Sequence, residues 1–419
     1  MTQYFELNRK DNIIQFTGKF GMTEIHPFRA AVYHAARKLG YRDIIFDFSK
    51  MTAAFAGPMI SACSQSISLR SEKIDIKLIL PDKKPLKRLF INTNWAYFIS
   101  PKEYPQSSFK GYTHVPTSIF RDHKEQAKAV NKVLDAILSS IRNIYRKDLS
   151  AVEWAINEIT DNVLVHSESE NGGLLQLSSF NTRQKRIEYV VCDAGIGIPG
   201  SLKPALDIDS DVQALDMSIK EGVTNGKGAG NGLFGSYQTS SMSGGFFHLH
   251  SGNGSLFYTP KPRAALVVKN ERVPFNGTLL VSCLDYAMPS LLENALVFGG
   301  KKGKGPDFIE LKYEDINVDR INFSLSTESD AFGTRPAGLP VRNKIMNLIA
   351  YYDSAFPIVI DFSNVPLLSS SFADEVFGKL FLEIGEEEYR SRVVLRDCDK
   401  MNKMLIERSL HQRKAGMPT

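Results

Sequence analysis

The chain has 419 residues, which is too long for one hydrophobic core and suits about three domains. Apolar residues make up 43% of it and charged residues 23%, as in ordinary globular proteins. No apolar run approaches the roughly 18 residues of a membrane span, and the N-terminus lacks the segments of a secretory signal. The net charge of +5 is modest and the lysine clusters are short, so nucleic acid is not expected as a partner. The four cysteines lack metal-ligand spacing, which fits a reduced, cytoplasmic setting.

Residues 1–115 alternate between buried-type strands and helices with an apolar stripe. The expected order is strand 13–16, helix 28–39, strand 42–49, helix 57–69 and strand 74–80. Such alternation predicts a small α/β sheet with helices packed on it. A helix is also predicted over 121–147, because apolar residues recur there at three- and four-residue spacing. We expect it to be one long helix, which serves either as a core helix of the next domain or as a lever or dimer seam.

Three polar and glycine-rich signatures follow, and the first lies on a predicted helix. Glu158, Asn162 and His166 are each four residues apart and therefore share one face. An amide oxygen can ligate Mg²⁺, and a carboxylate one turn away can orient or deprotonate an attacking nucleophile. The alternative is an ordinary solvated helix face.

The second signature ends a predicted strand at 187–192, which runs directly into Asp193. An ionised Asp only accepts hydrogen bonds, so it suits the amino group of adenine. Gly195 and Gly197 follow it and allow positive φ and close backbone approach. A glycine-rich turn after a strand also occurs without any ligand.

The third signature runs from Gly226 to Gly232 and precedes a predicted helix at 233–242. Successive glycine amides before a helix N-terminus form an anion site, and Lys227 either contacts a phosphate or is solvated. Residues 200–227 lack a continuous apolar pattern apart from a short helix near 211–220. Long loops of this kind are usually functional or disordered, so the segment is predicted to be a mobile lid.

Taken together, the three signatures resemble the GHKL (Bergerat) ATP-binding domain of topoisomerases, heat-shock chaperones, mismatch-repair ATPases, sensor histidine kinases and anti-sigma serine kinases. The resemblance covers residues 120–288, including the long helix at its start, and implies a two-layer α/β sandwich that binds ATP and Mg²⁺. It implies Asn162 as the Mg²⁺ ligand, and Glu158, one turn earlier on the same face, is the expected catalytic residue. The other cofactor contacts that it implies are Asp193, Gly195, Gly197, Gly228, Gly230, Gly232 and Thr278. His166, on the same helix face, and Lys227 are added to the expected cofactor contacts. No histidine in a phosphoacceptor context precedes the domain, which disfavours a sensor histidine kinase.

Residues 305–415 repeat the pattern of the first domain. Asp361-Phe362-Ser363 corresponds to Asp47-Phe48-Ser49, and the expected order is strand 321–325, helix 339–351, strand 357–363, helix 371–384 and strand 393–395. The repeat resembles the STAS-like family found beside bacterial ATP-binding proteins. STAS domains proper, the anti-sigma antagonists, carry Asp-Ser-Ser-Gly here, and the second serine is phosphorylated by a GHKL kinase. That resemblance makes Ser370 and Ser371 candidate phosphoacceptors, although Ser369 and Phe372 replace the family's Asp and Gly. A helix N-cap is the alternative for this serine run, with Ser371 and Asp374 as an approximate capping box. Residues 1–115 are interpreted as a degenerate STAS-like domain.

The expected fold is therefore a multidomain α/β protein, with a central GHKL sandwich flanked by two small STAS-like domains. Three functions remain open: an ATP-driven switch that acts through the STAS-like domains, a serine/threonine kinase of the anti-sigma type acting in cis or in trans, and a nucleotide-binding scaffold without turnover. The expected partner is another protein or a second copy of the chain. Hydrolysis and phosphotransfer need the same Mg²⁺–ATP geometry, so the sequence leaves the choice between them open.

Overall fold

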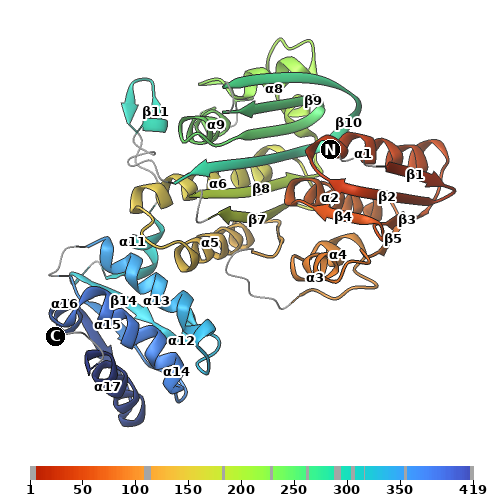
Figure 1. Ribbon diagram of the computed structural model, residues 1–419. Helices are drawn as coiled ribbons and strands as arrows, with labels where there is room; N and C mark the ends of the chain where they lie inside the picture. The colour runs from red at the N-terminus through yellow and green to blue at the C-terminus, as the bar shows by residue number, and fades with distance from the viewer. Residues whose placement is uncertain are drawn as a thin grey trace. The chain divides into compact units, whose positions relative to one another are not determined.

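The computed structural model describes residues 6–107, 115–181, 185–226, 230–260, 264–286, 294–302, 307–315, 317–352 and 356–415. It confirms a mixed α/β, multidomain fold (Figure 1). The chain forms two compact units. The N-terminal unit contains Met1–Val133 and Ala151–Gly305, and the C-terminal unit contains Leu134–Ser150 and Pro306–Thr419.

The first sheet of the N-terminal unit has the order β1-β2-β3-β5, with β4 paired to β2. β1 and β2 form an antiparallel hairpin, and β2, β3 and β5 run parallel. Its strands are β1 (Glu6–Lys10), β2 (Ile13–Phe20), β3 (Asp43–Asp47), β4 (Met51–Ala54) and β5 (Asp75–Ile79). Its helices are α1 (Ile25–Tyr33), which continues as the π-helical turn η2 (His34–Lys38), α2 (Ala56–Ser71), α3 (Lys84–Asn92) and α4 (Trp95–Ile99). The alternation predicted from the sequence is therefore confirmed.

The second sheet of this unit is antiparallel and has the order β6-β7-β8-β10-β9. Its strands are β6 (Ser118–Phe120), β7 (Gly173–Asn181), β8 (Arg186–Asp193), β9 (Phe247–Thr259) and β10 (Ala265–Asp285). The accompanying helices are α5 (His123–Ser140), α6 (Arg146–His166), α7 (Gly197–Leu202), α8 (Asp211–Ser218) and α9 (Gly232–Met242). A short hairpin, β11 (Val297–Phe298) and β12 (Lys301–Lys302), follows the sheet.

Both faces of this second sheet are covered, and alternate residues serve the two faces. Val190 and Cys192 of β8 belong to the same apolar core as the first sheet, against which α2 packs. The residues between and after them, Val191 and Asp193, line a cavity on the opposite face. Because successive side chains of a strand point to opposite faces, a nearly continuous apolar run can satisfy both. The side chain of Trp95 on α4 also contacts the second sheet, since its Nε1 donates to Gln176 Oε1 of β7 at 2.8 Å.

The prediction of a single helix over 121–147 is wrong. α5 ends at Ser140 and α6 begins at Arg146, with Asn143 between them in the left-handed region at φ 57°. Ile141 and Ile144 are nevertheless buried in this turn, so their spacing imitated a helical stripe. The physical cause of the break is a set of hydrogen bonds from the C-terminal unit, which is described below.

The sheet of the C-terminal unit has the order β13-β14-β15-β16 and repeats the topology of the first sheet. A hairpin comes first, and two parallel pairings follow. The strands are β13 (Glu314–Asp315), β14 (Arg320–Ser324), β15 (Ile358–Asp361) and β16 (Val393–Arg396). The helices are α11 (Phe308–Tyr313), α12 (Leu325–Glu328), α13 (Arg335–Ala350), α14 (Ser370–Ala373), the π-helical turn η3 (Asp374–Gly378), α15 (Lys379–Ile384), α16 (Glu386–Arg392) and α17 (Lys400–Ala415).

The repeated Asp-Phe-Ser sequence forms the same turn in both sheets. Asp47 accepts a hydrogen bond from the Ser49 N–H at 2.9 Å, and Asp361 accepts one from the Ser363 N–H at 2.8 Å. In each case the Phe N–H donates to the carbonyl of the neighbouring parallel strand, at 3.0 Å. The repeat therefore encodes one local structure, in which an Asp side chain closes the turn after a buried strand.

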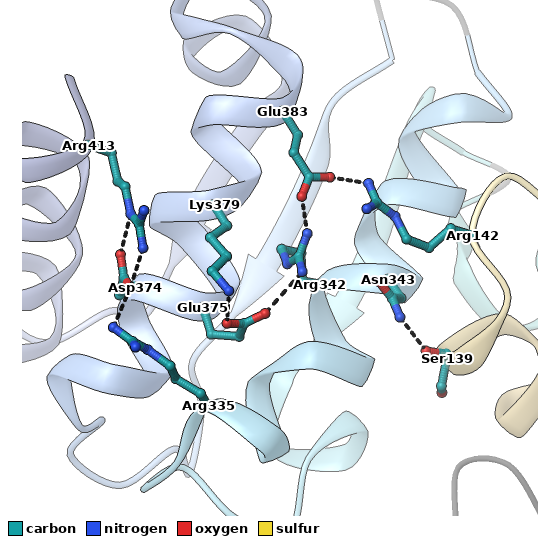
Figure 2. A network of polar contacts seen from close by, with 10 residues as sticks. All are labelled: Ser139, Arg142, Arg335, Arg342, Asn343, Asp374, Glu375, Lys379, Glu383 and Arg413. Atoms are coloured by element: carbon teal, nitrogen blue, oxygen red, sulfur yellow. Dashed lines mark hydrogen bonds and ion pairs between the residues drawn. The ribbon is translucent and has the colours of Figure 1, made fainter. Parts of the chain in front are cut away.

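Helix α13 holds the turn between α5 and α6. The Asn347 side chain donates to the carbonyls of Leu138 and Ile141, at 2.9 and 2.6 Å, and accepts from the Asn143 N–H at 2.8 Å. Asn343 donates to the Ser139 carbonyl at 2.9 Å (Figure 2). The last carbonyls of α5 thus find donors outside their own helix, which allows the helix to stop there.

Charged residues surround this joint in the C-terminal unit (Figure 2). The buried Glu375 accepts from Arg342 and Lys379, and Glu383 accepts from Arg342 and from Arg142 of the α5–α6 turn. These are paired, hydrogen-bonded charges of the kind that a protein interior tolerates. The network therefore fixes the turn to α13 and α15.

Candidate functional site

A cavity of about 470 Å³ opens in the N-terminal unit between α6, α7, the start of α9, the end of β8 and residues 278–280 within β10. Chain segments that are far apart in the sequence meet in its wall. The predicted site residues that line it are Glu158, Asn162, His166, Asp193, Gly197, Gly230, Gly232 and Thr278. Gly195 lies next to the cavity, while Lys227 and Gly228 fall outside the described residues.

Helix α6 contributes the predicted polar face. Glu158, Asn162 and His166 all reach the cavity, as their four-residue spacing predicts. Glu158 is half-buried, and this burial, followed by the nearby charge of Asp161, raises the pKa of its carboxyl group. A side chain on Gly232 would bring its Cβ to 2.6 Å from Glu158 Oε2, so a larger residue here would displace the Glu158 carboxylate.

Asp193 is buried where β8 ends. Its Oδ1 accepts the Gly195 N–H at 2.8 Å, and the backbone and hydroxyl of Thr278 also donate to the carboxylate. Burial outweighs these hydrogen bonds and raises the pKa of Asp193 to about 7. The side chain thus joins two turns, one after β8 and one within β10, while it still faces the cavity.

The glycines near Asp193 allow this close packing. A Cβ on Gly195 would lie 1.9 Å from the Ser167 carbonyl oxygen, so only glycine lets this turn pack against the backbone at the end of α6. Gly197 has φ +71° and Gly277 has φ +82°, which L side chains rarely adopt. The sequence assigned Gly195 and Gly197 to the nucleotide wall; the geometry also gives both a role in holding the turn against its neighbours.

Ser251 is a site residue whose role the sequence did not indicate. Its hydroxyl accepts the Ile198 N–H at 2.9 Å and donates to the Gly277 carbonyl at 2.8 Å. It also lies 3.3 Å from Thr278 Oγ1. One serine on β9 therefore connects α7 with the β10 turn that carries Thr278, and only its position across the sheet gives it this role.

An aromatic wall is the second feature that sequence reasoning missed. Trp154 and Phe298 line the cavity, with ring centroids 6.1 Å apart, and Phe234 lies 6.1 Å from Phe298 on another side. Trp154 stands one turn before Glu158 on α6, so its spacing could have indicated it. Phe298 comes from the β11–β12 hairpin, and no local signal links that hairpin to the cavity.

The segment predicted to be a lid contains more regular structure than its composition indicates. Helix α8 confirms the short helix expected near 211–220, and the Ser210 hydroxyl caps it by accepting the Gln213 N–H. Leu202, Ile208 and Ala214 form a small core under α7 and α8. Residues 219–226 have no helix or strand and lead toward Gly230, whose φ is +73°.

The donor set suits a nucleotide better than a metal ion alone. Within the described ranges, no group of three or more His, Cys, Asp or Glu side chains is placed to hold a metal. The cavity instead offers the acidic Asp193, the amide Asn162 and the N-terminus of α9, beside Glu158. Mg²⁺ commonly takes one or two protein oxygens and completes its shell with phosphate and water, which fits Asn162.

The candidate phosphoacceptors lie in the C-terminal unit. Ser370 and Ser371 occupy the first turn of α14 and are exposed. The N-cap is Ser369, whose hydroxyl accepts the Phe372 N–H at 3.0 Å, so the predicted capping box of Ser371 and Asp374 is wrong. Asp374 is instead held by Arg335 and Arg413 (Figure 2).

Comparison with protein families identifies one match. Residues 340–403 match a STAS-like domain of unknown function (DUF4325), so the C-terminal unit contains a STAS-like domain, a type of protein-interaction domain. Neither the curated proteins nor the solved structures contain a match to the chain. None of the helices among the described residues is long and apolar enough to cross a membrane.

Proposed function

We propose that the chain is a Mg²⁺–ATP-binding regulatory protein of the GHKL type, in which the nucleotide state controls the STAS-like domain. The observation that carries the proposal is the meeting of three sequence signatures in one cavity of about 470 Å³. Each signature alone has an ordinary structural explanation. Their convergence, with an acceptor for a base and a helix N-terminus for phosphates, supports a nucleotide as the occupant.

The residues of the chain would divide the work as follows. Asp193 accepts a hydrogen bond from the amino group of adenine, and Thr278 orients the Asp193 carboxylate by donating hydrogen bonds to it. Asn162 supplies an oxygen for Mg²⁺, and the first amides of α9 face the phosphates. Bound Mg²⁺–ATP would bring a transferable phosphoryl group to the site. Glu158 Oε2, whose carboxyl pKa burial raises, would take a proton from a water or hydroxyl.

Helix α6 supports the regulatory part of the proposal. It carries Glu158, Asn162 and His166 in the N-terminal unit, yet its residues 146–150 belong to the C-terminal unit. There Arg146 pairs with Asp307 and Glu314, both at 2.7 Å. A movement of α6 on nucleotide binding would therefore reach the residues that surround the STAS-like domain, and through them a protein partner or a second copy of the chain.

The first sheet favours a second STAS-like domain at the N-terminus. It shares the strand order, the strand directions and the Asp-Phe-Ser turn of the C-terminal sheet. Its equivalent of the serine run is Phe55-Ala56-Gly57, so no phosphoacceptor corresponds there. This part of the proposal makes residues 1–115 a divergent copy.

A protein kinase of the anti-sigma type is the second candidate. The exposure of Ser370 and Ser371 favours it, because both hydroxyls are available to an enzyme. If the chain is such a kinase, phosphate from γ-labelled ATP becomes attached to the protein, and Ser370→Ala or Ser371→Ala removes it. If the chain is the ATPase switch, the same substitutions leave the release of free phosphate unchanged.

The deciding experiment is incubation of the full chain with γ-labelled ATP and Mg²⁺, after equilibrium binding of ATP and GTP has been measured. The proposal expects ATP to bind more tightly than GTP and Asn162→Ala to lose most affinity when Mg²⁺ is present. Label released as free phosphate supports the ATPase switch, and label retained on Ser370 or Ser371 supports the kinase. Absence of ATP binding by the wild type would refute both.

A further inference from the structure

Arg29 of α1 is a buried cation for which the described residues offer no carboxylate partner. Only 5% of the residue is exposed, and among the residues that the structure describes no atom accepts a hydrogen bond from its Nε. Phe275 covers the flat face of the guanidinium, with the carbon 3.9 Å from the ring centroid. Such a contact uses the face of the group, so the N–H donors at its edge still need an acceptor.

A second, small cavity lies at this edge. Its volume is about 40 Å³, and it lies between α1, α2, the turn after β8 and the β10 turn. Besides Arg29, its lining includes Tyr33, Ser64, Gln65, Ser68, Ala194 and Asn276. Arg37 and Glu72 also line it, but they pair with each other at 2.5 Å and so cancel in charge.

The net charge of the side chains that line this cavity is therefore positive and comes from Arg29. Burial of a cation without a counter-ion is unfavourable, and the pKa of Arg29 falls to about 10 because of its burial. Gln65 is a second polar side chain of this lining that is not satisfied, since its Oε1 is buried without a partner among the described residues. A rotation of this amide by half a turn would instead direct its Nε2 donors into the cavity.

We propose that this cavity, the Arg29 pocket, is a binding site for a small inorganic oxyanion such as phosphate. The guanidinium edge offers the parallel N–H donors that match an oxyanion, and Gln65, Ser68 and Asn276 supply neutral donors around it. A cavity of this volume holds about three waters, which is the scale of one small ion and excludes a nucleotide or a peptide.

The Arg29 pocket is separate from the cavity of about 470 Å³ lined by Asp193 and Asn162, which we call the nucleotide cavity because of the proposed function. Both are lined by the chain at the end of β8. Ala194 lines the Arg29 pocket, while its neighbour Asp193 lines the nucleotide cavity. The Ser64 hydroxyl, also in the small pocket, donates to the Asp193 carbonyl at 3.1 Å. An anion beside Arg29 would thus stabilise the backbone that presents Asp193.

The test is thermal unfolding of the full chain with increasing inorganic phosphate, at constant ionic strength maintained with chloride. The wild type should show a saturable rise in melting temperature. Ser68→Asp places a tethered carboxylate in the pocket, so it should melt higher without phosphate and respond at least tenfold more weakly to it. Ser71→Asp adds the same charge to an exposed position of α2 outside the pocket and should respond like the wild type.

Further variants separate this site from the nucleotide cavity, which could also bind phosphate. Asn162→Ala alters only the nucleotide cavity and should keep the response, whereas Arg29→Gln should lose it. If Arg29→Gln does not fold, Ser68→Asp decides the matter alone. A wild type without a saturable response, a response lost in Asn162→Ala, or a Ser68→Asp variant that responds like the wild type would overturn the proposal.

Discussion

At the scale of single residues, burial and hydrogen bonding give Asp193 properties that a surface aspartate lacks. Its pKa of about 7 lies above the ordinary 3.8, so between these values the folded protein holds a proton that the unfolded chain has lost. Its contribution to folding stability therefore falls as the pH rises from about 4 to about 7. The proposed binding of adenine would depend on pH in the opposite direction and strengthen as the pH rises, because only the ionised carboxylate is purely an acceptor for an amino group.

We therefore expect ATP affinity to fall about tenfold between pH 8 and pH 6, since only about a tenth of Asp193 is ionised one unit below a pKa of about 7. Equilibrium titration of ATP at each pH measures this. Asp193→Asn should bind more weakly at every pH and lack the additional dependence. Because protonation of the nucleotide itself is common to both proteins, parallel pH profiles would contradict the role of Asp193.

Glu158 should act in turnover more than in binding. Glu158→Gln keeps the shape of the side chain beside Gly232 but removes the base, so ATP affinity should stay within a few-fold while turnover falls about 10²- to 10⁴-fold. Measurement of phosphate release at saturating ATP checks this. Glu170→Gln, at an exposed position after α6, serves as the matched control and should keep full turnover. An equal loss in both variants would remove Glu158 from the catalytic step.

At the scale of elements, the segment from α7 to α9 divides into an anchored part and a looser part. Asp211 at the start of α8 accepts the Asn253 N–H of β9 at 2.7 Å and pairs with Lys203 at the same distance. α8 is thus attached to the sheet, whereas residues 219–226 lack regular structure. Only the second part is placed to behave as a lid.

Hydrogen exchange should reveal this division. Amides of α8 are expected to exchange slowly in both states, because a capped helix packed on β9 protects them. Amides of residues 219–226 should exchange quickly without nucleotide and more slowly with a non-hydrolysable ATP analogue. Identical exchange of 219–226 in the two states would remove the lid hypothesis.

At the scale of the whole molecule, α6 is the element that carries site residues and also extends into the C-terminal unit, so the proposed switch would act through it. A ligand present at about 100 times its Kd stabilises the folded protein against unfolding by about 2.7 kcal/mol. Since α6 begins among residues of the C-terminal unit, part of this stabilisation should extend to α13, whose Asn347 holds the α5–α6 turn.

We expect the ATP analogue to slow amide exchange in α13 of the wild type. Asn347→Ala removes three hydrogen bonds at the turn and should cost about 2–4 kcal/mol of stability, measured by denaturant unfolding. It should leave ATP affinity unchanged and abolish the effect on α13. Asn317→Ala, at an exposed position of the same unit, is the control and should change neither quantity. Exchange that changes only in the N-terminal unit of the wild type would contradict the switch.

The sequence by itself determined the features that depend on local spacing. Four-residue spacing placed Glu158, Asn162 and His166 on one helix face, and the repeated Asp-Phe-Ser predicted the same buried strand twice. A strand followed by Asp193 and glycines predicted a tight turn at a strand end, and the structure has one. These features follow from backbone periodicity and side-chain length, which act over a few residues.

Only the tertiary structure decided where elements end and which distant residues complete a site. The break after Ser140 depends on Asn347 donors some 200 positions away, and a helical apolar pattern cannot show it. Phe298 reaches the cavity beside Asp193 through hairpin pairing, and Ser251 supports that cavity through sheet pairing. Phe275 covers Arg29 only because β10 brings its ring there. The reason is physical: hydrogen bonds and buried charges are satisfied by whichever groups are near in space, and the order of the residues alone does not say which groups those are.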